Sequence, residues 1–484
     1  MSLFLETGKC EGKGLNCLHL QAKYSNIFIK KLDASLDLFD QIISQTSGHK
    51  YCQFQTRNQI SKMAQNPWQS NFAKTTTPFQ TSTTSTGNTF GGNAFGTNSM
   101  TSNQAGLSLS PPPLDSVNDI CINKKNFIAT ASWSGINAWK YDPPQQTSSI
   151  GSVSSAGTQP QITTLIDDLP IDIRNEPMIR CAFNTATNDI LYFGSANGRI
   201  LRLHIPVCKC ESAGHHTDMV TGLKYCRERS TVVTSSPDGQ CYIWDPRKSQ
   251  TACIQLETGI NCTNIDVVRN TVAICGIEKS KNTPIIKLFD YRSISNGTAS
   301  QPLKSYEVPV EERNNFIQFS SVALNRDGNE FLASSLSGFL TISKGNNYKS
   351  TLICNKASKD NQSLAINSIA LMSNVITMDT YRAHGCFIGR ADGKISSLST
   401  FRTCKQNEGL EQIKMLNGDF LKQTGDPLPV TACAVSPDAK FLVYASGDDY
   451  SKGYFQNGSQ HLDVPTQVCI KPFSIDNDFK KLKI

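Results

Sequence analysis

The 484-residue sequence contains little charge, because Asp, Glu, Lys and Arg together make up 18% of it, against about a quarter in an ordinary soluble domain. No apolar run reaches the roughly 18 residues that a membrane-spanning helix needs, and no secretory signal opens the chain. We therefore expect a soluble intracellular protein that does not contact a membrane. The formal net charge of +7 permits an acidic partner or nucleic acid but requires neither.

The sequence also lacks the usual signatures of catalysis and of metal binding. It has no glycine-rich phosphate loop, no nucleophile elbow and no paired carboxylates at a recognisable spacing. Its 17 cysteines stand singly in apolar runs such as "GQCYIW", which predicts reduced, buried thiols and not a disulfide framework. Cys208 and Cys210 form one pair in "CKC", but no second pair follows at zinc spacing. We expect no enzyme, no metal and no cofactor.

Charge is nearly absent from one long segment. Residues 64–113 carry a single charged side chain, Lys74, among Thr, Ser, Asn, Gln, Gly and Pro. Such a segment cannot bury enough apolar surface to offset its chain entropy, so we predict a disordered tail over residues 63–113. It contains the pairs Phe90-Gly91 and Phe95-Gly96, which predict weak aromatic contacts from a mobile chain. Two such pairs do not by themselves distinguish a functional tail from ordinary low-complexity sequence.

Residues 1–62 form an N-terminal extension of mixed composition. The segment 27–44 places apolar residues at near-helical spacing, so the extension could contain one amphipathic helix. It could equally be sequence without a role, and its structure and function stay open.

From residue 114 onward, short strand patterns recur between turn signals, and the clearest unit is "AGHHTDMVTGLKYCRERSTVVTSSPDGQCYIWD" at residues 213–245. This unit resembles a WD repeat, with His216, Thr234, Asp238 and Trp244 at its four marker positions. The resemblance implies that these side chains hydrogen-bond in a chain across a sheet, which satisfies a buried indole and imidazole together. We therefore interpret them as structural, and not as a catalytic triad.

Six weaker copies of this unit surround the clear one and bring the total to seven. Because seven four-stranded units close into a ring, we predict an all-β fold, a seven-bladed WD-repeat β-propeller over residues 114–478. The closing strand should come from near residue 114, and insertions should lie at 143–170 and 402–426. The weaker copies lie at residues 117–142, 178–205, 259–291, 316–343, 365–398 and 429–473.

The set of repeats resembles one branch of WD-repeat proteins. The resemblance rests on "ASW" in the first unit, "IWDPRK" in the third, "DYR" in the fourth and "YASGDDYSKG" in the last. That branch holds the mRNA export factor of the nuclear pore, of the RNA-export/GLE2 type, and its sister, the BUB-type mitotic checkpoint propeller. Both bind a short acidic segment, the GLEBS motif, in a partner protein.

Two features favour the export factor over its sister. Export factors typically end their last blade with Tyr-Ala-Ser-Ser-Tyr-Asp-Trp-Ser-Lys-Gly, and this chain has a close variant at 444–453 that keeps Ser451, Lys452 and Gly453. They also often carry a tail rich in Phe-Gly, Ser and Thr, as residues 64–110 do. The checkpoint propeller and a generic WD-repeat adaptor remain alternatives.

The resemblance implies a partner-binding groove for the acidic segment on one face of the propeller. The residues that match family positions there are Arg313, Lys356, Arg292, Arg247 and Trp133. An arginine attracts carboxylates, whereas an exposed tryptophan anchors a peptide. The fifth unit departs from the family pattern at residues 336–339, and Pro237 stands where the family often has tryptophan. We expect a groove with altered details.

The resulting hypothesis is a non-enzymatic scaffold, a monomer within a heteromeric complex, in the nucleus at the nuclear pore with some cytoplasmic copies. Its expected partner is a GLEBS-containing nucleoporin, and it would assist mRNA export. Direct contact with mRNA or single-stranded RNA stays open, as do checkpoint-type kinases under the sister hypothesis. The sequence assigns no function to the loop at 448–461, where the last unit leaves the repeat pattern.

Overall fold

The computed structural model describes residues 106–143, 161–164, 176–247, 254–294, 301–313, 316–344, 347–352, 365–377, 381–404, 414–422, 428–450, 455–456, 459–460 and 465–475. These ranges all belong to one compact unit, residues 98–484. The predictions for residues 1–62 and for the Phe-Gly tail lie outside the described residues.

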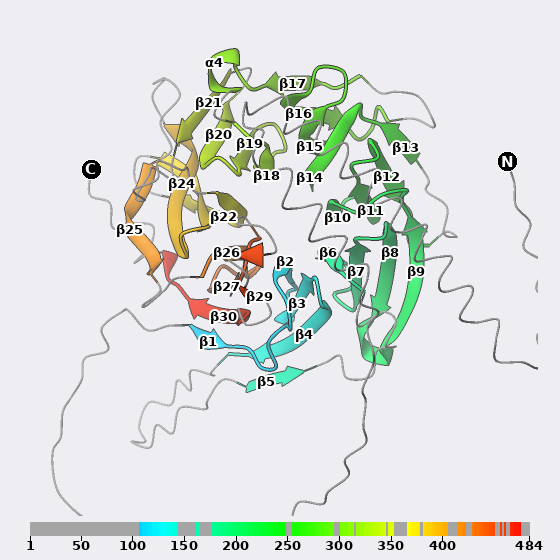
Figure 1. Cartoon of the computed structure of the whole chain (residues 1–484), viewed down its shortest axis with the longest axis vertical. Coiled ribbons are helices and arrows are strands. Elements are labelled where there is room, and N and C mark those ends of the chain that lie inside the picture. The colour runs from blue at the N-terminus through cyan, green and yellow to red at the C-terminus, as the bar shows by residue number, and fades with distance from the viewer. Residues whose placement is uncertain are drawn as a thin grey trace, which may run out of the picture. The chain divides into compact units, whose positions relative to one another are not determined.

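The described residues form seven four-stranded antiparallel sheets that follow one another around a ring (Figure 1). The innermost strand of each sheet contacts the innermost strands of its neighbours, and β2 contacts β26 where the ring closes. The predicted seven-bladed β-propeller is therefore confirmed.

The first four blades follow the chain without a crossover. Blade one contains β2 (Val117–Ile122), β3 (Phe127–Ser132), β4 (Gly135–Asp142) and β5 (Gln161–Thr164). Blade two contains β6 (Met178–Phe183), β7 (Ile190–Ser195), β8 (Arg199–His204) and β9 (Lys209–His215), with the short 3-10 helix η1 (Ile205–Val207) between the last two. Blade three contains β10 (Gly222–Cys226), β11 (Thr231–Ser235), β12 (Gln240–Trp244) and β13 (Ile254–Glu257). Blade four contains β14 (Ile260–Val268), β15 (Thr271–Glu278), β16 (Thr283–Asp290) and β17 (Lys304–Glu307).

The last three blades complete the ring, and the seventh takes a strand from the other end of the propeller. Blade five follows the single-turn helix α4 (Val310–Arg313) and contains β18 (Phe319–Leu324), β19 (Phe331–Ser335), β20 (Phe339–Lys344) and β21 (Asn347–Leu352). Blade six contains β22 (Ile366–Thr377), β23 (Tyr381–Arg390), β24 (Lys394–Cys404) and β25 (Lys414–Lys422). Blade seven contains β26 (Val430–Val435), β27 (Phe441–Ser446), β30 (Gln467–Pro472) and β1 (Leu107–Ser108), and β28 (Phe455–Gln456) and β29 (Ser459–Gln460) form a two-stranded hairpin between β27 and β30.

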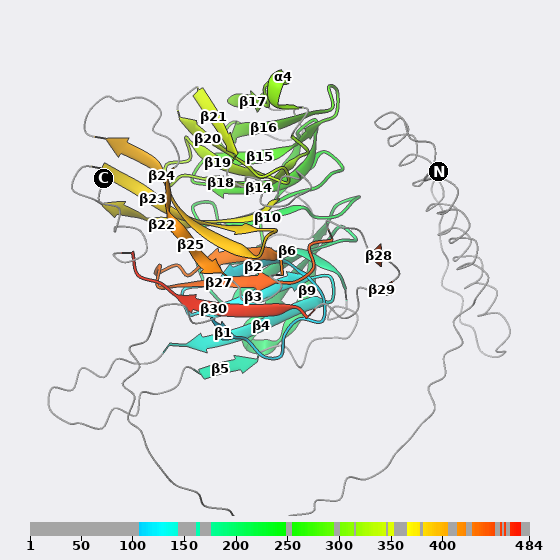
Figure 2. The same ribbon diagram turned by 60° about the vertical axis from the view of Figure 1, so that its left-hand side comes forward.

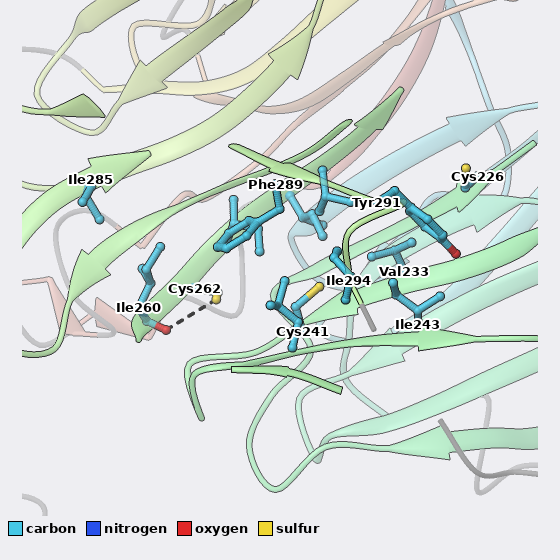
Figure 3. Packing of buried hydrophobic residues seen from close by; sticks show 14 residues of the cluster. Cys226, Val233, Cys241, Ile243, Ile260, Cys262, Ile285, Phe289, Tyr291 and Ile294 are labelled. Carbon is cyan, nitrogen blue, oxygen red and sulfur yellow. Dashed lines mark hydrogen bonds between the residues drawn. The ribbon is translucent and has the colours of Figure 1, made fainter. Parts of the chain in front are cut away.

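The second strand of each blade is the most deeply buried, because neighbouring blades cover both of its faces. In β27 every residue is buried, and in β7 all but the first are. A strand buried on both faces needs a continuous apolar run, as "FLVYAS" has, in place of a strict alternation. Side chains between blades three and four show this packing, with the small thiols of Cys241 and Cys262 among isoleucine side chains (Figure 3). These thiols are free, and burial raises the pKa of Cys262 to about 11.

Hydrogen bonds between innermost strands hold neighbouring blades in register. Asn118 Nδ2 donates to Met178 O at 2.9 Å, and Asp119 Oδ2 accepts from Cys181 N at 3.1 Å. Asp266 Oδ2 likewise accepts from Leu324 N at 2.7 Å. These bonds join buried backbone groups to side chains and so stabilise the junctions between blades one and two and between blades four and five.

The ring closes through a strand near residue 114, as predicted, but that strand lies just before the predicted domain boundary. β1 pairs with β30 through Leu107 opposite Ile470, so the closing strand precedes the predicted boundary at residue 114 (Figure 2). Residues 106–108, assigned above to the disordered tail, therefore belong to the propeller. A Cβ at Gly106 would lie 2.6 Å from the Ile470 carbonyl oxygen, so this close approach requires glycine.

The outermost strands also extend the predicted units. β5 lies within the predicted insertion at 143–170, and β25 lies within the one at 402–426. These strands are edges that only one neighbouring strand contacts, so they need few apolar residues and give a weak pattern.

Candidate interaction surfaces

The four marker residues of the clearest repeat form a chain of hydrogen bonds at blade three. His216 Nδ1 lies 3.2 Å from Asp238 Oδ2, and His216 Nε2 lies 2.8 Å from Thr234 Oγ1. Trp244 Nε1 donates to the same Thr234 oxygen at 2.8 Å. Because the carboxylate only accepts, His216 donates from Nδ1 and accepts at Nε2, and the Thr234 hydroxyl donates to it. Each polar atom of the chain thus has a complementary partner.

Asp238 anchors this chain at the turn between β11 and β12. Burial alone would raise the pKa of its carboxyl, but hydrogen bonds from His216 and from the backbone N–H groups of Gln240 and Thr217 outweigh it and lower the pKa to about 2. The carboxylate therefore stays charged at neutral pH and holds the turn. Thr234 is fully buried, so its hydroxyl supports the fold and faces no substrate.

The direction of the inner strands divides the connecting turns between two faces of the ring. The inner strands β2 and β6 run parallel, because Asn118 bonds to Met178 and the next residue, Asp119, bonds to Cys181 further along β6. We call the end where they begin the start face, and the other the end face. Since strands alternate in direction, turns from the second to the third strand of a blade, and connections between blades, lie on the start face. The remaining turns lie on the end face.

The predicted partner-binding residues do not share one face. Trp133, 37% exposed, lies in the turn between β3 and β4, and Arg313 ends α4 between blades four and five, so both lie on the start face. Arg247 and Arg292 follow the third strands β12 and β16 and lie on the end face. A single segment along one face cannot contact all four. Lys356 lies outside the described residues.

The predicted arginines differ in how tightly the protein already holds them. Arg313 donates to Val308 O at 2.8 Å and to Glu307 Oε2 at 3.2 Å, and hydrogen bonding from Lys281, with the charge of Arg313, lowers the pKa of Glu307. Arg292 clasps Asp290 through two nitrogens, at 3.0 and 2.7 Å, but stays 63% exposed. Arg292 is therefore more available to a partner than Arg313, because an exposed ion pair such as Arg292–Asp290 contributes little stability.

The end face also carries four arginines that the sequence interpretation did not single out. Arg227 and Arg229 lie between β10 and β11, Arg269 between β14 and β15, and Arg326 between β18 and β19, and all four are exposed. They come from blades three, four and five, which are neighbours in the ring. We call them, together with Arg292, the arginine rim.

Contacts within the arginine rim show that it is continuous. Arg229 donates to Asn270 Oδ1 at 2.9 Å and lies 5.5 Å from the centre of the Tyr291 ring, so it bridges blades three and four. Arg269 pairs with Asp327 at 3.1 Å and so bridges blades four and five. Neither Arg227 nor Arg326 forms an ion pair within the described part of the chain. The same turns and strand ends carry four carboxylates, those of Glu228, Asp290, Asp327 and Glu330, against these five arginines.

The start of the unexplained loop ties the last blade to the first on the start face. Tyr450 Oη donates a short hydrogen bond to Asp115 Oδ1, in the segment that leads into β2. Asp115 Oδ1 also accepts from Ser116 N at 2.6 Å. Asp449 Oδ2 accepts from Asn367 Nδ2 of blade six at 3.5 Å. The segment 448–450 therefore links the two blades on either side of blade seven.

Comparison with known protein families finds a match for one segment of the chain. Residues 207–245 match the family described as "WD domain, G-beta repeat". This segment is therefore similar to one WD repeat. The matched segment contains all four marker residues and covers β9 to β12. The remaining blades share the fold of this WD repeat.

Solved structures support the architecture of the whole ring. A crystal structure of RRP9 WD40 repeats superposes with a TM-score of 0.53 at 14% identity, over 76% of this chain and 96% of that one. A structure of U3-55K gives a TM-score of 0.52 at 14% identity, over 76% and 98%. At this identity the likeness concerns the fold alone. No curated protein matches the sequence.

Comparison of the weaker units with the WD repeat shows how most of the arginine rim could have been found from the sequence. Apart from Arg292, the members of the arginine rim occupy equivalent positions, the turns after the inner strands, in "CRERS", "VVRN" and "LNRDG". Aligning the weaker units on the WD repeat by their inner strands would have revealed this recurrence.

Within the described residues no cluster of His, Cys, Asp and Glu could hold a metal ion, and no helix there is long and apolar enough to cross a membrane.

Proposed function

We propose that this protein is a non-enzymatic scaffold whose end face binds an acidic segment of a partner protein through the arginine rim. The observation that carries the proposal is the recurrence of exposed arginines in three adjacent blades. Opposite charge across an interface speeds encounter and fixes the orientation of an extended segment. Propellers of this class generally serve as platforms for other proteins, which fits the proposal without naming a partner.

Two exposed ion pairs on the end face are of the kind that a partner can replace. Arg292 of the arginine rim and Arg247, outside it, each hold an aspartate two residues earlier while remaining exposed, at 63% and 74%. Exchanging a local carboxylate for one on a partner costs little at an exposed site. The planar guanidinium can then bind the incoming carboxylate through two hydrogen bonds.

The finer proposal is that the acidic segment is of the GLEBS type in a nucleoporin, and that the protein assists mRNA export at the nuclear pore. Its support is the resemblance of the last unit, "YASGDDYSKG", and of the "DPR" and "DYR" motifs that position Arg247 and Arg292. The start-face residues Trp133 and Arg313 are then outside the segment's path.

Recovery of partners from cells tests the finer proposal. A tagged full-length chain should recover a GLEBS-bearing nucleoporin, and a tagged chain with Arg227→Glu and Arg326→Glu should recover about tenfold less, because two charge reversals at a rim cost about 1.4 kcal/mol together. The matched control reverses Lys279 and Lys281 on the start face. A wild-type chain that never recovers a nucleoporin refutes the export proposal, and kinetochore proteins in its place would support the checkpoint alternative.

Single-stranded RNA is a second candidate for the same rim, because arginines bind phosphates as well as carboxylates and Arg229 already stacks over Tyr291. RNA affinity should then fall steeply with salt, with a slope of about −0.7 per phosphate contacted. A filter-binding titration without affinity at low salt would remove this candidate and leave the peptide proposal intact.

A further inference from the structure

The segment that joins β1 to β2 contains three consecutive prolines, in "LSPPPLDS" at residues 109–116. It connects blade seven to blade one and so lies on the start face, away from the arginine rim. Leu114 is 93% exposed, the highest value for a large apolar side chain among the described residues, and Pro111 and Pro112 are exposed beside it. We call Pro111, Pro112 and Leu114 the proline ridge. Contiguous exposed apolar residues of this kind mark interaction sites, whereas single ones are ordinary.

Proline chemistry restricts the backbone of the proline ridge. Each proline ring holds φ at about −65°, and a residue before a proline is confined to extended or polyproline II geometry. Polyproline II has three residues per turn and leaves its carbonyl groups free for a partner. This period places Pro111 and Leu114 on one edge and Pro113 on another. The burial agrees, because Pro111 and Leu114 are exposed while Pro113 is buried, and the chain bends on either side, at 110–111 and 114–115.

The protein holds the proline ridge in place at both ends. Before it, the carbonyl oxygen of Ser110 accepts a hydrogen bond from Trp139 Nε1 at 3.2 Å. After it, Asp115 Oδ1 accepts the hydrogen bond from the hydroxyl of Tyr450. A ligand that is already fixed in its bound shape loses little conformational entropy on binding. The ridge is therefore better prepared to enter a partner's groove than the same sequence in a free chain.

Trp133 extends the apolar surface next to the proline ridge. Its backbone N–H donates to Ser116 O at 3.1 Å, so the turn between β3 and β4 lies against the end of the proline-bearing segment. The indole is 37% exposed and contributes a large, flat apolar side chain. The start face thus carries an apolar surface at the junction of blades seven and one.

The composition of the segment indicates which kind of groove fits the proline ridge. Proline-rich polyproline II segments dock in grooves lined by aromatic side chains, whose rings pack against the proline rings. Residues 107–114 carry no charge, and the residue that follows is the acidic Asp115. A groove of the SH3 type adds an acidic pocket that takes a basic residue beside the prolines, which this segment lacks. A groove of the WW type clamps prolines between a tryptophan and a tyrosine and needs no such charge.

We propose that the proline ridge is the docking site for a partner domain whose groove is lined by a tryptophan and a tyrosine, as in WW domains. Pro111 and Pro112 would lie between the two aromatic rings, and Leu114 would pack beside them. The ridge and the arginine rim lie on opposite faces of the ring, so both can be occupied at once. The test of the ridge therefore does not depend on the proposed function.

Surface plasmon resonance with immobilised WW domains tests the proposal. The full chain would be passed over a panel of WW domains that differ in their groove residues, with a panel of SH3 domains as the second arm. At least one WW domain should bind with a Kd of about 0.1 mM or tighter, and the SH3 domains should not bind. Absence of binding to every WW domain up to about 1 mM overturns the proposal, and so does binding to SH3 domains alone.

Matched variants separate the proline ridge from binding elsewhere on the chain. Leu114→Ser should weaken binding at least about tenfold, because a leucine that becomes buried in a groove contributes more than that factor requires. The control is Leu303→Ser, which removes an exposed leucine, 60% accessible, from the end face and should leave the Kd within about twofold. Both side chains are exposed, so both variants should unfold at the wild-type urea concentration. Equal binding by wild type and Leu114→Ser overturns the proposal.

Discussion

Tyr450 and Asp115 lie far apart in the sequence and join by a hydrogen bond that crosses the closure of the ring. Closure through β1 involves the pairing of Leu107 and Ser108 with β30 and one further backbone bond, from Leu109 N to Val468 O at 2.8 Å, so it is short. The bond from Tyr450 adds a second link between blades seven and one, on the start face. The departure of the last unit from the repeat pattern thus has a structural role at its first residues.

Removing this link should destabilise the propeller. We expect Tyr450→Phe to lower the free energy of unfolding by about 1–2 kcal/mol, because the acceptor is a carboxylate. The midpoint of urea unfolding measures the change. In a double-mutant cycle, Asp115→Asn combined with Tyr450→Phe should cost less than the sum of the single changes. Additive losses would mean that the two side chains do not act together.

The low pKa of Asp238 predicts a pH-dependent stability. Its folded pKa of about 2 lies below the unfolded value of 3.8, so the stabilisation is present above pH 3.8 and is lost as the pH falls toward 2. After allowance for solvent screening, we expect Asp238→Asn to cost about 1–2 kcal/mol at pH 7 and progressively less below pH 4. Urea unfolding of both proteins across this range provides the test, and a difference that does not change with pH would contradict it.

Gly214 is required by the packing of Trp244. A Cβ at Gly214 would lie 2.5 Å from the indole ring, so Gly214→Ala should destabilise the protein by about 1–3 kcal/mol. It should also displace the indole from Thr234, which near-ultraviolet circular dichroism can detect. Ser212→Ala on the same strand is the control and should change the unfolding midpoint little.

Much of the fold could be predicted from the sequence, because the patterns that specify most strands lie within those strands and their turns. The inner three strands of each blade carry strong apolar patterns with turn signals, as "TVVTSSPDGQCYIW" does, so the number and order of the blades could be predicted. The outermost strands β5 and β25 could not, because an edge strand needs little apolar sequence. The closing strand β1 is too short to give a pattern, and its pairing is set by β30 at the far end of the chain.

The candidate surface was predicted less well, because it depends on strand direction. The residues Arg247 and Arg292 were chosen individually from their motifs, and so were Arg313 and Trp133. Whether they share a face follows only from the number of strands between them, and the structure separates them into two pairs. Arg227 and Arg326 each look like an ordinary turn residue, and only the ring brings them to one rim.

The most direct test of the account measures the binding of an acidic peptide to the end face. Fluorescence anisotropy would follow a labelled, glutamate-rich peptide titrated with the full chain at low and at physiological salt. We predict binding that weakens with salt, that falls about tenfold in Arg227→Glu with Arg326→Glu, and that stays unchanged in Lys279→Glu with Lys281→Glu. Equal losses in the two double variants, or no binding at low salt, would contradict the proposal that the arginine rim is the partner-binding surface.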